Sequence, residues 1–188
     1  MSESPELDPA LLADEFLDLL RERAAARFDD KLEQAFVDWY VEAEFGDVKW
    51  HFTDGPNDGG IDALVWLDDE KLPVVIIQSK FSRKIGARTL AQNAYERFSE
   101  VVDLFCGRDE DAFELWLDQV HESLRSNYRK AYDRLSALHG ANKKKAFRLI
   151  TCSRRAASNE HQRLPPEAYQ YDEDVLALYR HYRVVGMP

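Results

Sequence analysis

The stretch Thr53–Phe81, TDGPNDGGIDALVWLDDEKLPVVIIQSKF, sets the expected fold of this chain. Its first part, residues 53–60, is rich in Asp, Asn, Gly and Pro, which favour turns and left-handed backbone conformations. The apolar run 61–67 and the β-branched run 74–77 then predict two strands, the second buried on both faces. A turn at 68–71 joins them. The stretch therefore predicts a polar loop followed by a β-hairpin.

Three polar side chains interrupt this hairpin: Asp62 near the start of the first strand, and Gln78 and Lys80 near the end of the second. Gln78 and Lys80 are two residues apart, so they point to the same face of a strand. If the strands pair across the turn, Asp62 approaches both. A carboxylate and an amide oxygen suit a hard cation such as Mg²⁺, and a neighbouring lysine can orient a water or stabilise charge on a phosphate. The plain alternative is a loop cap, an edge polar residue and a solvated lysine.

The motif D-G-G-I-D at 58–62, followed by an apolar strand ending in Q-S-K at 78–80, resembles the PD-(D/E)XK nuclease superfamily. It is similar to Mrr-type restriction endonucleases and especially to the amino-terminal nuclease domain of abortive-phage-infection (AIPR-type) proteins. The resemblance implies an α/β, restriction-endonuclease-like fold of three layers, with a central mixed sheet flanked by helices and with extra amino-terminal and inserted helices. Proteins of that family usually continue beyond this domain, which would make the chain the amino-terminal part of a longer protein.

The resemblance also assigns roles to residues. Asp62, Gln78 and Lys80 would be catalytic, and Asp62 and Gln78 would bind Mg²⁺ or Mn²⁺. Gln78 departs from the superfamily pattern, which has Asp or Glu there, so the site carries one negative charge less. The first core helix often adds an acidic ligand, for which Glu33 is the candidate; the alternative is a surface glutamate. Asp58 could reach the metal through a water, or serve only as a turn residue.

The charge of the chain is unevenly distributed. The net charge is −10, but residues 1–48 hold 14 acidic and 4 basic side chains, so the remainder is balanced with 21 of each. Two stretches, 80–90 and 140–155, contain basic residues and no acidic ones. Such patches can contact phosphates in an acidic protein, although solvated surface charge is the alternative for 143–145. The candidates for nucleic-acid contacts are Arg83, Lys84, Arg88, Lys143, Lys144, Lys145, Arg154 and Arg155.

The composition excludes several classes of protein. At 188 residues and 45% hydrophobic the chain fits one domain with a core. It has no apolar run of membrane-spanning length, and its acidic amino terminus is not a signal peptide. Its two cysteines form no disulfide framework or metal-binding pattern, so a cytoplasmic setting is expected. It also has no Walker-type or GxGxxG loop, and therefore no sequence support for nucleotide cofactors.

Helical periodicity predicts the flanking elements. Residues 1–28 contain an amphipathic helix that would pack either on the domain or on a partner chain, the latter giving a homodimer. Residues 29–188 would form the nuclease domain. Its expected elements are helices at 31–45 and 87–105, one long helix or two at 111–139, a strand at 146–152, a short helix at 172–182 and a last strand at 183–185.

These observations predict a Mg²⁺- or Mn²⁺-dependent nuclease that hydrolyses phosphodiester bonds, with DNA as the expected substrate. The resemblance implies a role in defence against phage. The alternative is a nuclease-like fold without catalytic activity, kept as a nucleic-acid-binding or oligomerisation module, which the amide at Gln78 would favour.

Overall fold

The computed structural model describes residues 9–81, 92–107, 109–138, 141–151 and 172–185. Within these ranges it contains helices and strands in mixed order. They are α1 (Pro9–Arg27), α2 (Leu32–Phe45), β1 (Lys49–Phe52), β2 (Ala63–Trp66), β3 (Val74–Lys80), α3 (Gln92–Cys106), α4 (Glu110–Gln119), α5 (Glu122–Ser136), α6 (Ala141–Lys144), β4 (Phe147–Thr151), β5 (Asp172–Asp174) and α7 (Val175–Val185).

The described strands form one mixed, five-stranded sheet in the order β1-β2-β3-β4-β5. Strands β1, β2 and β3 pair antiparallel, with Ala63 opposite Ile77, which confirms the predicted hairpin. Strands β3, β4 and β5 pair parallel, and Lys80 lies opposite Thr151. The carboxyl-terminal ends of β3 and β4 therefore lie side by side, with Gln78 and Lys80 at this end of β3.

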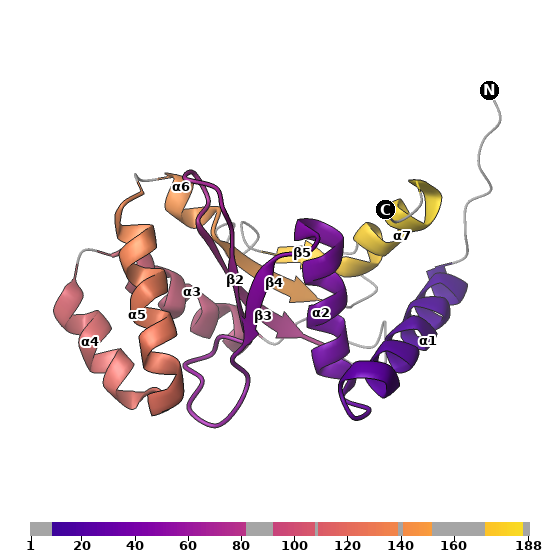
Figure 1. Ribbon diagram of the computed structural model, residues 1–188, viewed down its shortest axis with the longest axis horizontal. Helices are drawn as coiled ribbons and strands as arrows, with labels where there is room; N and C mark the ends of the chain where they lie inside the picture. The colour runs from indigo at the N-terminus through magenta and orange to yellow at the C-terminus, as the bar shows by residue number, and fades with distance from the viewer. Residues whose placement is uncertain (1–8, 82–91, 108, 139–140, 152–171, 186–188) are drawn as a thin grey trace.

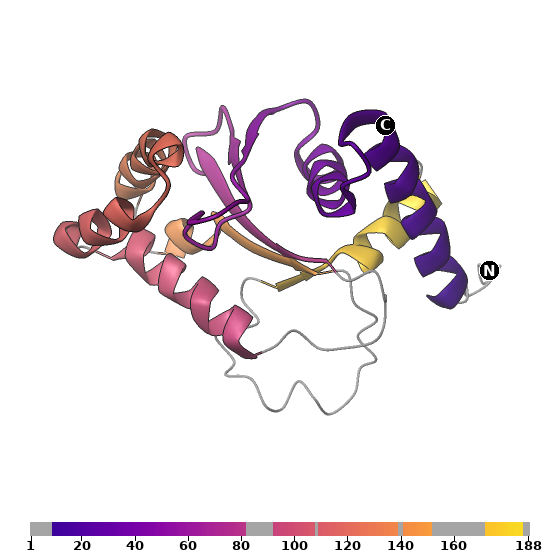
Figure 2. The ribbon, with the colours of Figure 1, turned by 90° about the horizontal axis from the view of Figure 1, so that it is seen from below.

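Helices cover both faces of this sheet, as Figures 1 and 2 show. Alternate strand residues supply the two cores: Leu64 and Ile76 pack with residues of α3, α4 and α5, whereas Val65 and Ile77 pack with residues of α1, α2 and α7. This alternation follows from the two-residue period of a strand. The molecule is thus mixed α/β, with a helical layer on each side of a mixed sheet, as the sequence predicted at this level.

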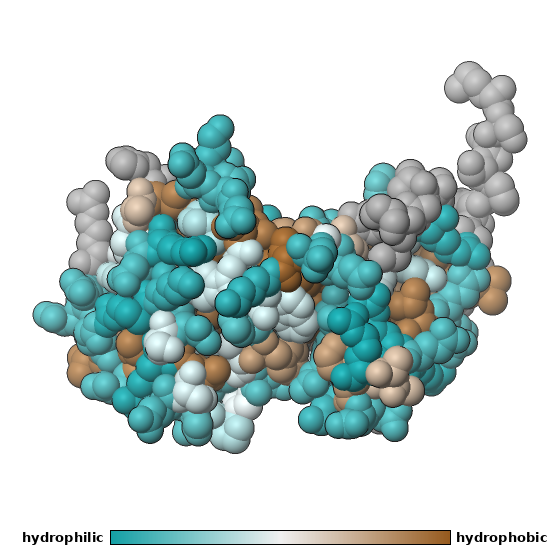
Figure 3. Space-filling model, viewed as in Figure 1, coloured by the Kyte–Doolittle hydropathy of each residue, from teal (hydrophilic) through white to brown (hydrophobic). Residues whose placement is uncertain are grey.

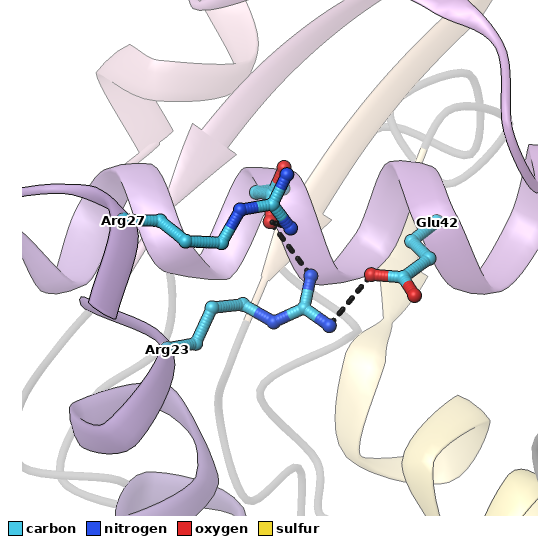
Figure 4. A network of polar contacts seen from close by, with 4 residues as sticks. Arg23, Arg27 and Glu42 are labelled. Atoms are coloured by element: carbon cyan, nitrogen blue, oxygen red, sulfur yellow. Dashed lines mark hydrogen bonds and ion pairs between the residues drawn. The ribbon is translucent and has the colours of Figure 1, made fainter. Parts of the chain in front are cut away.

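Helix α1 packs on the rest of the domain rather than standing apart from it. Its apolar stripe, which includes Phe16 and Leu20, is fully buried in the same core as α2. Polar contacts reinforce the pair: Arg23 Nη2 lies 2.6 Å from Glu42 Oε2, as Figure 4 shows. The buried carboxylate of Asp38, on α2, also accepts hydrogen bonds from Arg23 Nη1 at 2.7 Å and Arg27 Nη1 at 2.8 Å. Helix α1 therefore fixes the position of α2.

The structure decides one open alternative and corrects one expected element. Of the one long helix or two expected over 111–139, it has two, because Val120 takes an extended conformation and His121 caps α5. The strand expected at 183–185 is wrong, because α7 continues to Val185. The short strand before it, β5, pairs with β4 and was not predicted, since its three residues are all acidic.

Hydrophilic residues dominate the face shown in Figure 3. Among the described residues, no helix combines the length and the apolar character needed to cross a bilayer.

Candidate metal centre

The loop between β1 and β2 has a conformation that its Gly and Asn residues make possible. Asn57, Gly59 and Gly60 all have positive φ angles, of 59°, 72° and 81°. These residues adopt the left-handed region at low cost. The carboxylate of Asp58 accepts hydrogen bonds from the N–H groups of Gly60, at 2.7 Å, and Gly55, at 3.3 Å. The loop thus closes on its own aspartate, which accounts for the turn role expected of Asp58.

The base of the loop is tied to the strands by Thr53. Its hydroxyl donates to the carbonyl of Ile61 at 2.6 Å, and its N–H donates to the carbonyl of Asp62 at 2.8 Å. Thr53 is buried, so these bonds are shielded from water. Residues 53–62, which we call the aspartate loop, therefore begin and end at fixed positions.

Asp62 lies where β2 begins with a bulge. Its N–H donates to the carbonyl of Ile77 at 2.9 Å, although Ala63 is the ladder partner of Ile77, so two residues oppose one. The Asp62 carboxylate then reaches the end of β3. Its Oδ2 accepts hydrogen bonds from the Ser79 N–H at 2.6 Å and from the Ser79 hydroxyl at 2.8 Å. Asp62 is held beside the residue that separates Gln78 from Lys80, as the hairpin predicted.

Three aspartates of the aspartate loop converge. One carboxylate oxygen from each of Asp54, Asp58 and Asp62 lies within 4.8 Å of the other two. Asp54 is exposed, whereas Asp58 and Asp62 are partly buried. Lys80 is close enough to interact electrostatically with Asp54 and Asp62, and Glu33 of α2 with Asp54. The structure therefore places Glu33, Asp58, Asp62 and Lys80, all predicted site residues, around one cluster.

Burial, more than the crowding of carboxylates, changes how Asp54 and Asp62 titrate. Burial raises the pKa of Asp62, and this effect exceeds the opposing effects of the Ser79 hydrogen bonds and of Lys80. Burial also raises the pKa of Asp54, assisted by repulsion from Asp58 and Glu33 and opposed by Lys80. Among the described residues, Lys80 offsets part of this effect at both Asp54 and Asp62. A divalent cation among them would relieve the repulsion.

Gln78 lies on the face of β3 beside this cluster and is 5% exposed. A Cβ added to Gly60 would lie 3.9 Å from its Nε2, so the amide packs against the aspartate loop next to Asp58. Its Oε1 is buried and accepts no hydrogen bond from the described residues. A buried acceptor without a partner costs about 1–3 kcal/mol. A cation or a bound water could satisfy such an oxygen, and the neighbouring carboxylates of Asp54, Asp58 and Asp62 are ligands that suit a hard cation.

One member of the cluster was missed in the sequence. Asp54 was seen as a loop residue but was not selected as a ligand. The signal that could have identified it is the spacing of Asp54, Asp58 and Asp62, four residues apart in a glycine-rich loop. The role of Ser79 as a partner of Asp62 was missed as well, because the bulge that aims the carboxylate is not visible in the sequence.

The basic residues expected to contact nucleic acid are not gathered at the cluster in the described residues. Lys143 and Lys144 end α6, and Lys145 lies between α6 and β4; Lys143 and Lys144 interact electrostatically with Cys106. Thr151, the partner of Lys80, is six residues after Lys145, which corresponds to roughly 20 Å along a strand. Figure 1 shows α6 and the aspartate loop at opposite ends of the sheet. Arg83, Lys84, Arg88, Arg154 and Arg155 lie outside the described residues.

The comparisons with known proteins assign no family to this geometry. A scan against protein-family models, a search of curated proteins and a search of solved structures each found no match.

Proposed function

We propose that this protein hydrolyses phosphodiester bonds of nucleic acid in a reaction that requires Mg²⁺ or Mn²⁺. The observation that carries the proposal is the convergence of Asp54, Asp58 and Asp62 within 4.8 Å, beside Gln78 and Lys80. DNA as the substrate, a restriction-endonuclease-like fold and a role in phage defence rest on the sequence resemblance and remain part of the proposal.

The chain's own residues would hold the cation. Asp54, Asp58, Asp62 and the free Oε1 of Gln78 supply oxygen ligands of the kind that Mg²⁺ and Mn²⁺ prefer. When bound, such an ion polarises a phosphoryl oxygen and lowers the pKa of a coordinated water. Without it, the cluster of carboxylates would repel a phosphodiester, so charge alone makes substrate binding depend on the cation.

Lys80 is the residue that would act on the substrate. It is partly buried at the end of β3, and its charge reaches both Asp54 and Asp62. From this position its ammonium can contact a phosphate oxygen or orient an attacking water, and it stabilises negative charge that develops on the phosphoryl group. Ser79 holds Asp62 in place through two hydrogen bonds, so the carboxylate needs little reorganisation.

The test is cleavage of supercoiled plasmid by the full chain with Mg²⁺, with Mn²⁺, or with EDTA. The informative variants are Asp62→Asn and Lys80→Met. Their matched controls are Asp68→Asn and Lys71→Met, which change exposed residues of the β2–β3 turn. Single-stranded DNA and RNA of the same sequence serve as further substrates.

We expect cation-dependent cleavage by the wild-type chain and both control variants, and a loss of at least about 100-fold in Asp62→Asn and Lys80→Met. Cleavage that persists in either site variant, or that persists in EDTA, would contradict the proposal. Binding of cation and DNA without cleavage would instead support the alternative, a nuclease-like module without catalytic activity, which Gln78 in place of an acid would explain.

A further inference from the structure

Helices α4 and α5 contact the aspartate loop at three successive residues. The N–H of His121 donates to the carbonyl of Asn57 at 2.9 Å. The hydroxyl of Tyr128 donates to the carbonyl of Asp58 at 2.5 Å. At the next residue, a Cβ added to Gly59 would lie 2.4 Å from the indole Cζ2 of Trp116, so the indole is packed directly on the glycine. In Figure 1 the loop descends beside the end of α5 that begins at Glu122.

Tyr128 is the most buried of these contacts. It is 0% exposed, and its ring packs against Trp116 and Phe105, with centroids 5.4 Å and 6.5 Å away. The side chain of Thr53, at the base of the loop, also lies next to the phenol. Burial raises the pKa of Tyr128, so the hydroxyl keeps its proton at all physiological pH values and remains a donor. A rigid side chain thus presents one fixed donor to the loop backbone.

The contact matters because the loop is held in a conformation that its own charges oppose. One carboxylate oxygen from each of Asp54, Asp58 and Asp62 lies within 4.8 Å of the other two, so holding these like charges together costs electrostatic repulsion. A loop of Gly and Asn residues has many alternative conformations in which these carboxylates separate. Anchoring the carbonyl of Asp58 from behind removes many of those alternatives before any cation arrives.

Resting on the function proposed above, we propose that Tyr128 is a positioning residue: its hydrogen bond to Asp58 preorganises the aspartate loop and so sets the affinity of the centre for divalent cations. Tyr128 does not itself contact cation or substrate. Outer partners that orient metal ligands typically contribute 10- to 100-fold to metal affinity.

The experiment measures Mn²⁺ and Mg²⁺ binding to the full chain by isothermal titration calorimetry. Tyr128→Phe removes the hydroxyl and keeps the ring. Tyr132→Phe is the matched control, because it makes the same change one helical turn later, where the ring stacks on Phe113 with centroids 4.0 Å apart. We expect Mn²⁺ affinity to fall at least about 10-fold in Tyr128→Phe and to stay unchanged in Tyr132→Phe.

A second variant approaches the same loop from the other side. Gly59→Ala introduces a Cβ against Trp116 at a residue whose φ is +72°, so it displaces the loop and leaves Tyr128 intact. It should weaken cation binding to a similar extent. The double variant should lose more Mn²⁺ affinity than either single variant. Its fold-loss should nevertheless be smaller than the product of the two single fold-losses, because both substitutions act on one loop position. If Tyr128→Phe does not fold, Gly59→Ala decides: unchanged affinity overturns the proposal.

Cleavage provides a second readout of the affinity for the cation. Cleavage by Tyr128→Phe should be recovered by raising the Mn²⁺ concentration, whereas cleavage by Asp62→Asn should not. If wild type and Tyr128→Phe bind Mn²⁺ equally well, the positioning role is wrong and the proposed function stands. If the wild-type chain binds neither Mg²⁺ nor Mn²⁺, both proposals fail.

Discussion

The Asp62 carboxylate accepts two hydrogen bonds from Ser79, from the backbone N–H at 2.6 Å and from the hydroxyl at 2.8 Å. Two donors from one residue fix the orientation of a carboxylate at the start of β2 relative to the end of β3. Lys80, the next residue along β3, interacts electrostatically with the same carboxylate, so the structure places Asp62 beside this one of its two predicted partners.

Replacing Ser79 by Ala tests this contact. The variant loses the hydroxyl donor and keeps the N–H, so the Asp62 carboxylate becomes less well oriented. In wild type the two Ser79 hydrogen bonds lower the pKa of Asp62 and so oppose the effect of burial; without one of them, the pKa of Asp62 should rise further. We expect stability to fall by about 1 kcal/mol in urea unfolding, and Mn²⁺ affinity to fall several-fold. Ser79→Thr, which keeps a hydroxyl, is the control. Equal Mn²⁺ affinity in Ser79→Ala and wild type would show that the contact does not orient a ligand.

The pH dependence of stability follows from Asp62. Its pKa is raised in the folded protein above the ordinary value of 3.8, so the folded state binds this proton more tightly than the unfolded state. The resulting stabilisation is fully present below that ordinary value and is lost as the pH rises through the raised pKa. In EDTA, Asp62→Asn should therefore match wild type near pH 3.5 and become the more stable protein as the pH approaches 7.

Urea unfolding between pH 3.5 and 7 checks this, with Asp68→Asn on the exposed turn as the control that should show no such trend. Saturating Mn²⁺ should reverse the order at pH 7, because wild type then gains binding energy that Asp62→Asn lacks. An Asp62→Asn variant that is less stable than wild type at pH 7 in EDTA would contradict the assignment of Asp62 as a repelled, partly buried charge.

Gln78→Glu restores the acid that the resembled superfamily has at this position. The new carboxylate would be buried beside Asp54, Asp58 and Asp62, so the cation-free protein should lose stability at pH 7. The added negative charge should at the same time raise the affinity for Mg²⁺. Thermal unfolding with and without Mg²⁺ measures both effects. A variant that shows the stability loss with no gain in Mg²⁺ affinity would place Gln78 outside the centre.

The ion pairs between α1 and α2 should affect the free energy of unfolding and not the metal centre. Arg23, with 17% of its side chain exposed, contacts both Asp38 and Glu42, whereas Arg27 is 54% exposed and contacts Asp38. Arg23→Ala leaves the buried Asp38 with one partner and should cost about 3 kcal/mol. Arg27→Ala, and Arg21→Ala on the surface, should each cost under about 1 kcal/mol. Similar losses for Arg23→Ala and Arg21→Ala would contradict this ranking.

The hairpin could be predicted from the sequence because it depends on local patterns. The β-branched run of β3 and the turn before it leave few alternatives to antiparallel pairing, and that pairing brings Asp62 to the end of β3, beside Lys80. The helical layers followed similarly from apolar periodicity.

The rest of the centre could not be predicted because it depends on residues distant in the chain. Asp54 and Asp62 belong to a loop that also contacts Trp116, through Gly59, and Tyr128, through Asp58, about 60 to 70 residues later in the chain. Strand β5 has an acidic sequence that disfavours strands, and it forms because β4 offers a free edge. The extension of α7 to Val185 likewise overrides a weak strand pattern.

The central claim is that Asp54, Asp58, Asp62 and Gln78 hold a divalent cation beside Lys80. A crystal structure of the full chain soaked in Mn²⁺, with anomalous diffraction recorded at the manganese edge, tests it most directly. We predict an anomalous peak bounded by these carboxylates with the Gln78 Oε1 among the ligands or bound to a coordinated water. An empty cluster at millimolar Mn²⁺, or a peak elsewhere on the protein, would contradict the claim.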